Sequence, residues 1–397
     1  MPRQLAAGNL TSILCCADAI VRQWTGLFRR AFIVLSIFIL FLSNFILLLS
    51  NKKSNKNENK HKEERNQQNM RKRKGLNKGR VDMDIRSFAE MVSRAVSEEL
   101  GSGCQVKLQE VIKNNGVILQ GLVILAKGQN ISPTIYLNSF LDAYEAGTPL
   151  VGIVTRILEI YQEDLPESDI NMDFFREFEE VRPRICYKII NHGRNRGLLE
   201  RIPHIDFLDL SICFFYAYQN ETLGFGSILI YNSHMEMWNC STETLLKLAQ
   251  ENTRRLFPWK AHDMGALLRQ LAECETLGRG KLPEEGEEEP DEECPMRVLT
   301  NTRRLHGATC MIYPGLLGAL AGEVDENLYI LPSSIHEVIL VPESAVDDPE
   351  VFKDMVREVN ATQVEPEEIL SDNLYFYKRL ENRVEIASQT IICFIVK

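Results

Sequence analysis

The stretch CQVKLQEVIKNNGVILQGLVILA, residues 104–126, indicates the fold class of most of the chain. Two β-type runs, Cys104 to Ile112 and Val117 to Ala126, flank the turn sequence Asn114-Asn115-Gly116, a combination typical of a β-hairpin. A third β-type run, Ile131 to Leu137, follows another short polar turn. The sequence therefore predicts a meander of three strands.

Helical patterns lie on both sides of this meander. Asp84 to Leu100 carries apolar residues at helical spacing, and Gly101 ends the pattern. Phe140 to Gln162 is helical in two pieces, with a break at Gly147 to Pro149. This order of elements predicts an α+β fold with mixed or antiparallel sheets and flanking helices.

The rest of the sequence predicts further short strands and helices, and it shows no internal repeat of fixed period, which argues against a solenoid. The expected strands are Ile185–Ile190, Leu208–Tyr218, Phe225–Tyr231, one near Val298, Leu328–Leu331, Val338–Val341, Leu374–Tyr377 and Thr390–Val396. The expected helices are Asp173–Glu180, one capped by Ser241, one led by Tyr313-Pro314, and Asp348–Val359.

Charge is distributed unevenly along the chain. Residues 1–82 hold 16 Lys and Arg against 5 Asp and Glu, which leaves 29 against 50 for residues 83–397 out of totals of 45 and 55. We call these parts the basic head and the acidic body. The net charge of the body is therefore −21, and such a charge repels phosphate backbones. A protein partner is favoured over a nucleic acid.

The 10 cysteines predict neither a disulfide framework nor a zinc ribbon. They occur singly, apart from the adjacent Cys15 and Cys16, and no C-x-x-C motif is present. Cys213 and Cys393 lie inside apolar runs, where a free thiol behaves as a small hydrophobe. This usage fits a reducing cytosol. The sequence also has no glycine-rich phosphate loop and no dinucleotide fingerprint, so no cofactor is expected.

The basic head contains a candidate membrane span. Ala31 to Ser50 is an uncharged stretch of 20 residues rich in Phe, Ile and Leu, which matches the thickness of a bilayer's hydrocarbon core. We expect an N-terminal segment over residues 1–30, one transmembrane helix over 31–50, and a basic, disordered tether over 51–82. The basic tether places the acidic body on the cytoplasmic side by the positive-inside rule.

An alternative is that the head is not translated and that the protein starts at Met83, which would make it cytoplasmic. T-rich DNA followed by A-rich DNA reads as an apolar run followed by a run of Asn and Lys, which is the order in the head. Lys78-Gly79-Arg80 can also be encoded by a purine-rich ribosome-binding sequence close to Met83. Both starts are compatible with the sequence.

The acidic body is expected to divide at residues 277–295. This stretch is rich in Glu, Gly and Pro, so it cannot bury apolar surface. We expect it to be a solvated acidic loop between an α+β lobe over residues 83–276 and a C-terminal α+β lobe over residues 296–397.

Ser334, His336 and Glu337 form the densest polar cluster between two apolar strands. A serine near a histidine and a carboxylate could build a nucleophile and its base, which would make the chain a hydrolase-type enzyme. A buried hairpin with capped backbone groups explains the same residues, and no G-x-S-x-G nucleophile elbow is present. These three residues are therefore the catalytic candidates of the sequence, with a structural turn as the alternative.

Two further groups are candidates for binding. His204, Asp206 and Asp209 offer imidazole and carboxylate ligands, but their spacing matches no compact metal motif, so no metal is expected. A turn rich in Asn and Gly carries Arg194 and Arg196, whose guanidinium groups could hold an anion. A local cap and an exposed loop are the simpler interpretations.

Four strings of the body stand out: RIPHIDFLDL (201–210), YPGLL (313–317), YILPSSIHEV (329–338), and EVNATQV (358–364) leading to Leu370-Ser371-Asp372. In these strings the body resembles an uncharacterised bacterial family, the domain-of-unknown-function family numbered 5688. The resemblance covers most of the chain from about Met83 onward. It implies an intracellular α+β domain and supplies no activity.

The leading hypothesis for function is a non-catalytic intracellular interaction or adaptor domain, because no catalytic signature occurs in a body of this size. The alternative is a hydrolase-type enzyme that uses Ser334, His336 and Glu337. An enzyme needs these groups in a concave pocket, whereas an adaptor needs an exposed apolar surface.

Overall fold

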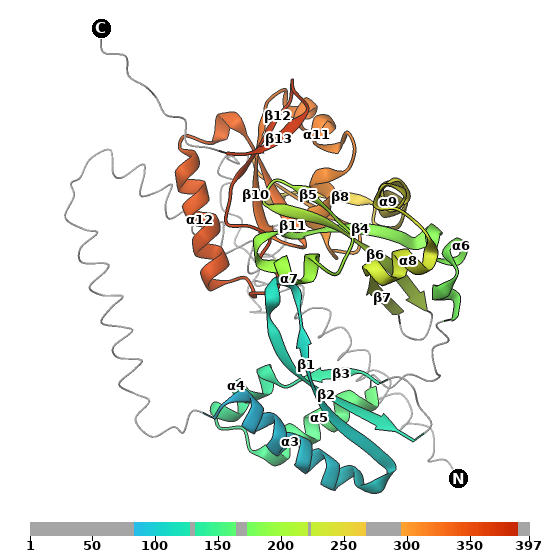
Figure 1. The fold of residues 1–397 in the computed structure, drawn as a ribbon. Coiled ribbons are helices and arrows are strands. Elements are labelled where there is room, and N and C mark those ends of the chain that lie inside the picture. Colours follow the sequence, from blue (N-terminus) through green and yellow to red (C-terminus); the bar gives the residue numbers. More distant parts are fainter. Residues whose placement is uncertain (1–82, 128–131, 164–172, 221–223, 267–294, 388–397) are drawn as a thin grey trace, which may run out of the picture. The chain divides into compact units, whose positions relative to one another are not determined.

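A computed structural model gives the fold and describes residues 83–127, 132–163, 173–220, 224–266 and 295–387 (Figure 1). Contacts divide these residues into two compact units. The N-terminal unit contains residues 83–205 and 212–253. The C-terminal unit contains residues 206–211 and 254–387.

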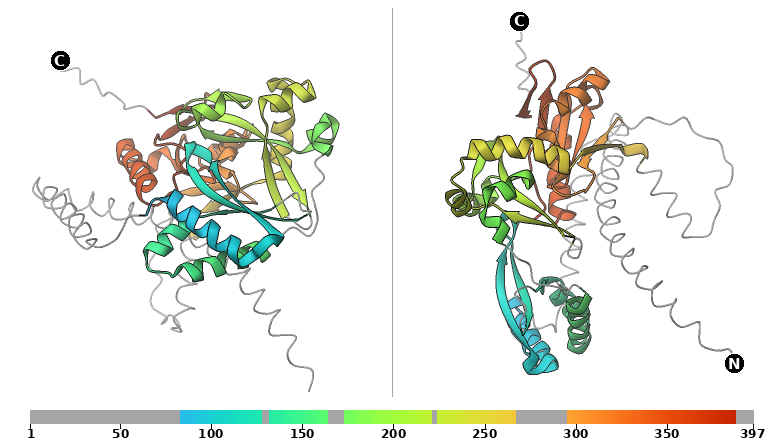
Figure 2. Two further views of the ribbon diagram at one scale, coloured as in Figure 1. Left: turned by 60° about the horizontal axis from the view of Figure 1, so that its bottom comes forward. Right: turned by 90° about the vertical axis from the view of Figure 1, so that its right-hand side faces the viewer.

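The N-terminal unit begins with a helix, a three-stranded antiparallel sheet and two further helices, coloured blue to green in Figures 1 and 2. The β1–β2 register runs without a shift from Cys104 opposite Ala126 to Ile112 opposite Ile118. The predicted meander and its flanking helices are confirmed. The elements are α3 (Ile85–Leu100), β1 (Cys104–Ile112), β2 (Ile118–Ala126), β3 (Thr134–Tyr136), α4 (Asn138–Glu145) and α5 (Leu150–Glu163).

Local signals explain where α3 begins and ends. The carboxylate of Asp84 accepts hydrogen bonds from the backbone N–H groups of Arg86 and Ser87, which satisfies donors at the helix start. Gly101 follows the helix with a φ of +60°, a conformation that glycine adopts most easily. The apolar stripe of α3 packs with α5 on one face of the sheet. The core there is formed by Phe88, Ala89, Val92, Val96, Leu122, Ile124, Ile135, Leu137, Ile153, Val154, Ile157 and Tyr161.

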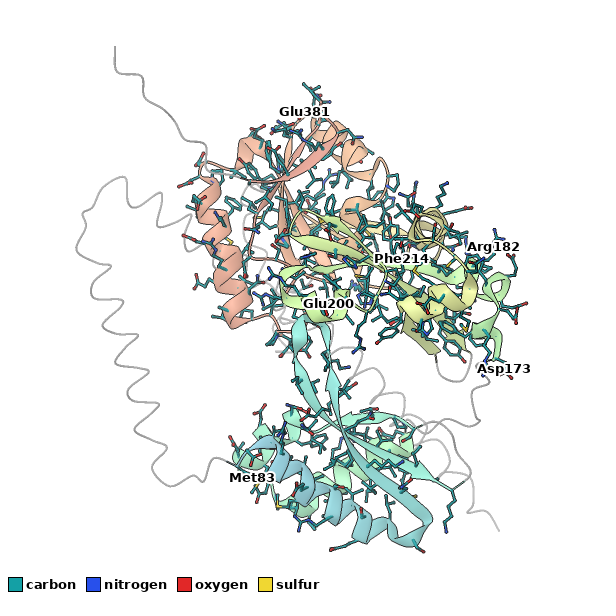
Figure 3. All side chains as sticks on the ribbon, viewed as in Figure 1. Met83, Asp173, Arg182, Glu200, Phe214 and Glu381 are labelled. Atoms are coloured by element: carbon teal, nitrogen blue, oxygen red, sulfur yellow. The ribbon has the colours of Figure 1, made fainter. Side chains whose placement is uncertain are left out.

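A second sheet contains four strands, with β6 between β4 and β5 and with β7 also paired to β6. Phe214 of β6 is fully buried in this part of the chain (Figure 3). The strands expected at residues 185–190, 208–218 and 225–231 are confirmed. The elements are the 3-10 helix η3 (Asp173–Arg176), α6 (Phe178–Val181), β4 (Ile185–Asn191), α7 (Arg196–Leu199), β5 (His204–Phe207), β6 (Leu210–Asn220), β7 (Gly224–Leu229), α8 (Asn232–Trp238) and α9 (Thr242–Leu256).

Side chains of α9 cover backbone groups of β4. The Thr253 hydroxyl accepts a hydrogen bond of 3.0 Å from the Tyr187 N–H, and the buried Asn252 amide donates to the carbonyl oxygens of Arg182 and Ile185 at 2.8 and 3.0 Å. An unpaired strand edge would leave such groups without partners or open to another chain. In the N-terminal unit, α9 therefore protects β4 from both outcomes.

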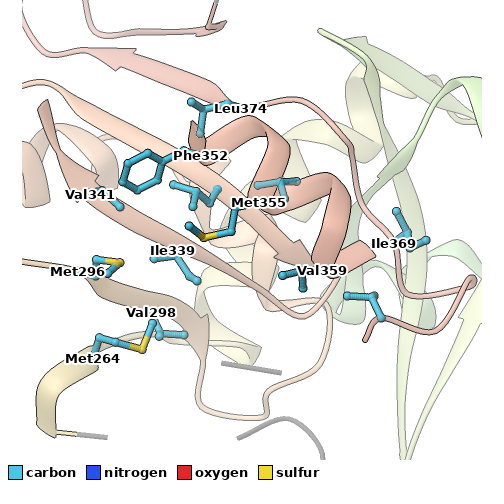
Figure 4. Close-up of a cluster of buried hydrophobic side chains, with 13 residues drawn as sticks. Met264, Met296, Val298, Ile339, Val341, Phe352, Met355, Val359, Ile369 and Leu374 are labelled. Atoms are coloured by element: carbon cyan, nitrogen blue, oxygen red, sulfur yellow. The ribbon is translucent and has the colours of Figure 1, made fainter. Parts of the chain in front are cut away.

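The C-terminal unit is built on a six-stranded antiparallel sheet in the order β13-β12-β10-β11-β9-β8. Helix α12, capped by Asp348 and led by Pro349, packs on this sheet through Phe352, Met355 and Val359 (Figure 4). The elements are β8 (Trp259–Asp263), β9 (Arg297–Asn301), the 3-10 helix η6 (Gly307–Ile312), α11 (Leu316–Val324), β10 (Leu328–Ser334), β11 (Glu337–Pro342), α12 (Pro349–Thr362), β12 (Tyr375–Lys378) and β13 (Arg383–Ile386).

The structure places the division of the body differently from the sequence analysis. The chain passes into the C-terminal unit for residues 206–211 and enters it again at Arg254, because β8 pairs with β9 and so joins the C-terminal sheet. The expected transmembrane helix at 31–50 and the expected strand at 390–396 lie outside the described residues. Within the ranges that the structure describes, no helix is long and apolar enough to cross a membrane.

Candidate functional site

The Ser334, His336 and Glu337 group lies where β10 turns into β11. Strand β10 ends at Ser334 and β11 begins at Glu337, with a register shift just before the turn, so His336 stands in the turn itself. The Ser334 hydroxyl accepts a hydrogen bond of 3.0 Å from the backbone N–H of His336. Ser334 is therefore bonded to the backbone of His336, as a capping group in a tight turn is.

The imidazole of His336 points toward other partners. Its Nδ1 accepts a hydrogen bond of 3.2 Å from the backbone N–H of His306, and its Nε2 lies 3.4 Å from Oε1 of Glu368. The two imidazole rings are stacked, with centroids 6.0 Å apart. His336 is 7% exposed and Ser334 is 4% exposed. A substrate would not reach a serine and a histidine buried to this extent, so the geometry favours a structural role for both.

A second cluster surrounds Asp209. Its Oδ2 accepts hydrogen bonds from the Ser371 hydroxyl at 2.6 Å and from the Asn373 amide at 3.0 Å, and its Oδ1 accepts one from the Tyr375 hydroxyl at 2.7 Å. Ser371 and Tyr375 are fully buried. Three donors thus satisfy the carboxylate, and they fasten residues 206–211 to the remainder of the C-terminal unit.

The other proposed metal ligands do not share this cluster. His204 belongs to the N-terminal unit, where its Nδ1 lies 3.0 Å from the carbonyl oxygen of Ile202, whereas Asp206 is an exposed residue of the C-terminal unit. Among the described residues, no group of three His, Cys, Asp or Glu side chains could hold a metal ion. The Asp209 cluster is therefore an arrangement of hydrogen bonds within one unit.

The turn with Arg194 and Arg196 is organised by asparagines. The Asn191 side chain accepts a hydrogen bond of 2.9 Å from the backbone N–H of Arg194. The buried Asn195 exchanges two hydrogen bonds, of 2.8 and 2.9 Å, with the backbone and side chain of Asn115 in the β1–β2 turn. Both arginines are exposed. The side chains of Asn191 and Asn195 thus hold this turn by hydrogen bonds.

The edge of β1 was not among the sites that the sequence indicated. Strand β1 ends the order β1-β2-β3, and the structure pairs its backbone with β2 alone among the described residues. Next to the turn, the N–H of Lys113 donates a hydrogen bond to the carbonyl oxygen of Val117, so Lys113 faces β2 with its backbone groups. Because this orientation alternates along an antiparallel strand, Glu110 points its N–H and C=O groups away from β2, toward the open edge. The strand has nine residues and no proline, glycine or bulge. The sequence signal that could have indicated this edge is the position of β1 as the first strand of a meander, because such a strand has a neighbour on one side only.

An apolar pair lies at the turn end of this edge. Ile112 and Ile118 stand directly opposite each other in the β1–β2 register and are 69% and 54% exposed. They continue the face of the sheet that carries α3 and α5, because Leu122 and Ile124 share that face with Ile118 by strand alternation. The free edge and this pair together form the surface that we call the β1 edge.

The fold and these clusters define the class of the protein. Within the described residues it is an α+β protein with antiparallel sheets, buried clusters of hydrogen-bonded polar side chains, and a nine-residue edge strand, β1, that pairs with β2 alone. The model of a family of unknown function, DUF5688, matches residues 85–379. The chain belongs to this family, which confirms the resemblance found in the sequence. Neither a curated protein nor a solved structure matches the chain.

Proposed function

We propose that the chain is a non-catalytic protein-interaction module in which the β1 edge receives an extended segment of a partner protein. The observation that carries the proposal is the open, uninterrupted edge of a nine-residue strand. Proteins that bind partners by strand addition obtain affinity from the main-chain hydrogen bonds of such an edge. Edges without this use are normally short, bulged or covered.

A contrast within the N-terminal unit supports this reading. Asn252 and Thr253 of α9 cover backbone groups of β4, while nothing comparable covers β1 in the described part of the chain. An unprotected edge promotes aggregation unless a partner occupies it. The difference between the two edges is therefore expected if β1 is an interface.

The side chains of β1 indicate the chemistry of the partner segment. Val106 and Leu108 are partly buried on the face that carries α3, and Ile112 is exposed on the same face. Lys107 is exposed on the opposite face. A partner strand that alternates apolar and acidic side chains would place the apolar ones beside Val106 and Leu108 and an acidic one beside Lys107.

The test compares two substitutions at one position. Glu110→Pro removes an outward N–H of β1, whereas Glu110→Ala keeps it, and both remove the exposed ion pair of Glu110 with Arg86. First, a photo-cross-linking amino acid replaces Gln109 in the full chain, and a partner that cross-links to it in the native host is identified. The partner is then purified, and calorimetry measures its affinity for the wild-type chain and for each variant. Amide hydrogen exchange then locates its contacts.

We expect the partner to bind the wild-type chain and Glu110→Ala equally, to bind Glu110→Pro at least about tenfold more weakly, and to protect amides 104–112. We expect the cross-linked partner to be a different protein. A cross-link to a second copy of the chain would contradict the adaptor role and would show that the β1 edge serves self-association. Equal binding of both variants, or protection elsewhere, would overturn the proposal.

We further propose that residues 31–50, where they are translated, hold this module at a membrane with residues 83–397 on the cytoplasmic side. The uncharged stretch of 20 residues and the basic flank support this arrangement. A protein that starts at Met83 would be cytoplasmic instead. Mass spectrometry of the protein from its native host decides between them, because peptides from residues 1–82 exist only if the head is translated.

A further inference from the structure

The three-stranded sheet of the N-terminal unit has a second face, opposite to the one that carries α3 and α5. The register sets residues of β1, β2 and β3 side by side, so side chains of all three strands share this face. We call it the open face. Its apolar residues are Val111 of β1, Leu119, Val123 and Leu125 of β2, and Tyr136 of β3.

The open face is more apolar than a sheet face in water usually is. An antiparallel sheet with one buried face normally carries polar side chains on the other. Here the middle strand presents Leu119, Val123 and Leu125, and all three are partly exposed. None of the three belongs to the core cluster that α3 and α5 form with the sheet. Apolar side chains gathered in this way mark a docking surface.

A glycine makes the open face continuous across the three strands. A Cβ atom at Gly121 of β2 would lie 2.6 Å from Cγ2 of Thr134 and 3.3 Å from Cγ2 of Val111, so these two side chains already fill the space above Gly121. Nε2 of Gln109 donates a hydrogen bond of 3.4 Å to Oγ1 of Thr134. Side chains of the two outer strands therefore meet over the middle strand.

The open face is positively charged, although the net charge of the acidic body is −21. Lys107 of β1 and Lys113, which follows β1, alternate onto this side. Nζ of Lys113 lies 4.1 Å from the ring centroid of Tyr136, so its ammonium group is held over the face. Glu110, the acidic residue of these strands, lies on the other face and pairs with Arg86. An occupant with acidic residues at its margins therefore complements the open face.

We propose that the open face binds an amphipathic helix of a partner protein, which lays an apolar stripe on β2 and places acidic residues beside Lys107 and Lys113. The backbone of β2 is already paired with β1 and β3, so an occupant contacts the face through side chains alone. A helix offers such a stripe, and α3 and α5 cover the other face of the same sheet in this way.

The aromatic content of the open face argues against a nucleic-acid strand as the occupant. Single strands bind to rows of aromatic rings on which successive bases stack. Tyr136 is the aromatic residue of the open face, and its ring already carries the ammonium group of Lys113. The aliphatic side chains of β2 suit a protein instead.

The experiment identifies the occupant in the native host and then tests its charge. A photo-cross-linking amino acid replaces Val123 of the middle strand in the full chain, and mass spectrometry identifies the partner and the residue that cross-links. The partner is purified, and calorimetry at low salt measures its affinity for the wild type and for Lys107→Glu/Lys113→Glu. Arg94→Glu/Lys247→Glu is the control, because it changes the net charge equally at exposed positions outside the sheet.

We expect the cross-link to lie in a partner segment that has apolar residues at helical spacing and acidic residues beside them. Lys107→Glu/Lys113→Glu should weaken binding at least about tenfold and the control less than about twofold, and added salt should weaken binding to the wild type. Replacement of the partner's acidic residues by lysine should restore binding to Lys107→Glu/Lys113→Glu, which also shows that this variant is folded.

A cross-link to nucleic acid, to a second copy of the chain or to no protein would overturn the inference, and so would equal binding of the two charge variants. The test is separate from that of the β1 edge, because Glu110→Pro alters the backbone of β1 and keeps every side chain of the open face. Binding that is lost with Glu110→Pro and kept with Lys107→Glu/Lys113→Glu would overturn the open face alone, and the reverse result would support it without the β1 edge.

Discussion

The hydroxyl of Tyr375 donates a hydrogen bond of 2.7 Å to the carboxylate of Asp209, which lies 166 positions earlier in the sequence. Tyr375 is fully buried, and burial together with the charge of Asp209 raises the pKa of its phenol. The bond is therefore a charge-assisted contact between distant segments of the C-terminal unit. Such bonds contribute more to stability than bonds between neutral groups.

Tyr375→Phe is expected to lower the free energy of unfolding by about 1.5–3 kcal/mol, because it removes a donor to a charged group in a buried place. Tyr377→Phe is the matched control, since Tyr377 is buried on the same strand but donates to the neutral amide oxygen of Asn382 at 2.8 Å. We expect the control to cost about half as much. Urea denaturation of both variants measures the difference, and equal losses would mean that the charge of Asp209 adds nothing.

Two adjacent serines of β10 are expected to respond oppositely to removal of the hydroxyl. Ser333 is buried, its Oγ has no hydrogen-bond partner among the described residues, and it lines a cavity of about 10 Å³ with Met355 and Val359 of α12. Ser333→Ala should raise the free energy of unfolding by about 1 kcal/mol, because it removes an unsatisfied buried group.

Ser334→Ala should lower the free energy of unfolding by about 1–2 kcal/mol, because it leaves the buried N–H of His336 without its acceptor. The same denaturation experiment measures both serine variants. Destabilisation by Ser333→Ala would show that a partner such as an ordered water occupies the cavity.

Much of the fold could be predicted because the long elements carry strong periodic patterns. The helix from Ile85 to Leu100 and the hairpin from Cys104 to Ala126 both match their expected bounds within a residue. The short strands β5, β8 and β13 were missed, since sequences such as Trp259–Asp263 alternate little and are largely exposed. Pairing with a neighbouring strand, which no local pattern shows, makes them strands.

The candidate sites were harder to predict than the fold. Ser334 and His336 would share a face if the strand continued, but the register shift and the turn place Ser334 against the backbone of His336 instead. The hydrogen-bond donors of Asp209, which are Ser371, Asn373 and Tyr375, lie 162 to 166 positions later in the sequence. Such distant neighbours are set by tertiary structure.

The buried thiol of Cys310 should make stability fall at high pH. Its Sγ lies 3.2 Å from the carbonyl oxygen of Thr300, and burial raises its pKa from 9.0 to about 12. The unfolded chain loses this proton from about pH 9, while the folded chain keeps it until about pH 12. This contribution to stability is therefore complete below pH 9 and is lost as the pH rises, by at most about 1.4 kcal/mol per pH unit.

Cys310→Ala should reduce the decline in the free energy of unfolding between pH 9 and 11, as measured by urea denaturation at each pH. Other groups also titrate in this range, among them tyrosines, lysines and Cys213, and the pKa of Cys213 is also about 12. Because they titrate in both proteins, the difference in free energy of unfolding between wild type and variant isolates Cys310. A difference that stays constant over this range would contradict the raised pKa.

Gly307, the first residue of η6, tests how tightly the turn that holds His336 is packed. A Cβ atom at this position would overlap the Thr300 hydroxyl and the carbonyl oxygen of His336, two groups that already share a hydrogen bond of 2.8 Å. Neither is the free end of a flexible side chain, so the backbone must shift to admit a methyl group. Gly307→Ala should lower the free energy of unfolding by about 3 kcal/mol or more.

Gly322 of α11 supplies the control, because an added Cβ there meets no heavy atom within 4 Å and the position is helical. Gly322→Ala should raise the free energy of unfolding by about 0.5–1 kcal/mol, since alanine loses less conformational entropy than glycine in a helix. Thermal and urea denaturation measure both variants. A Gly307→Ala protein as stable as the wild type would mean that the β10–β11 turn and η6 can separate, which would expose His336 and reopen the case for a catalytic role.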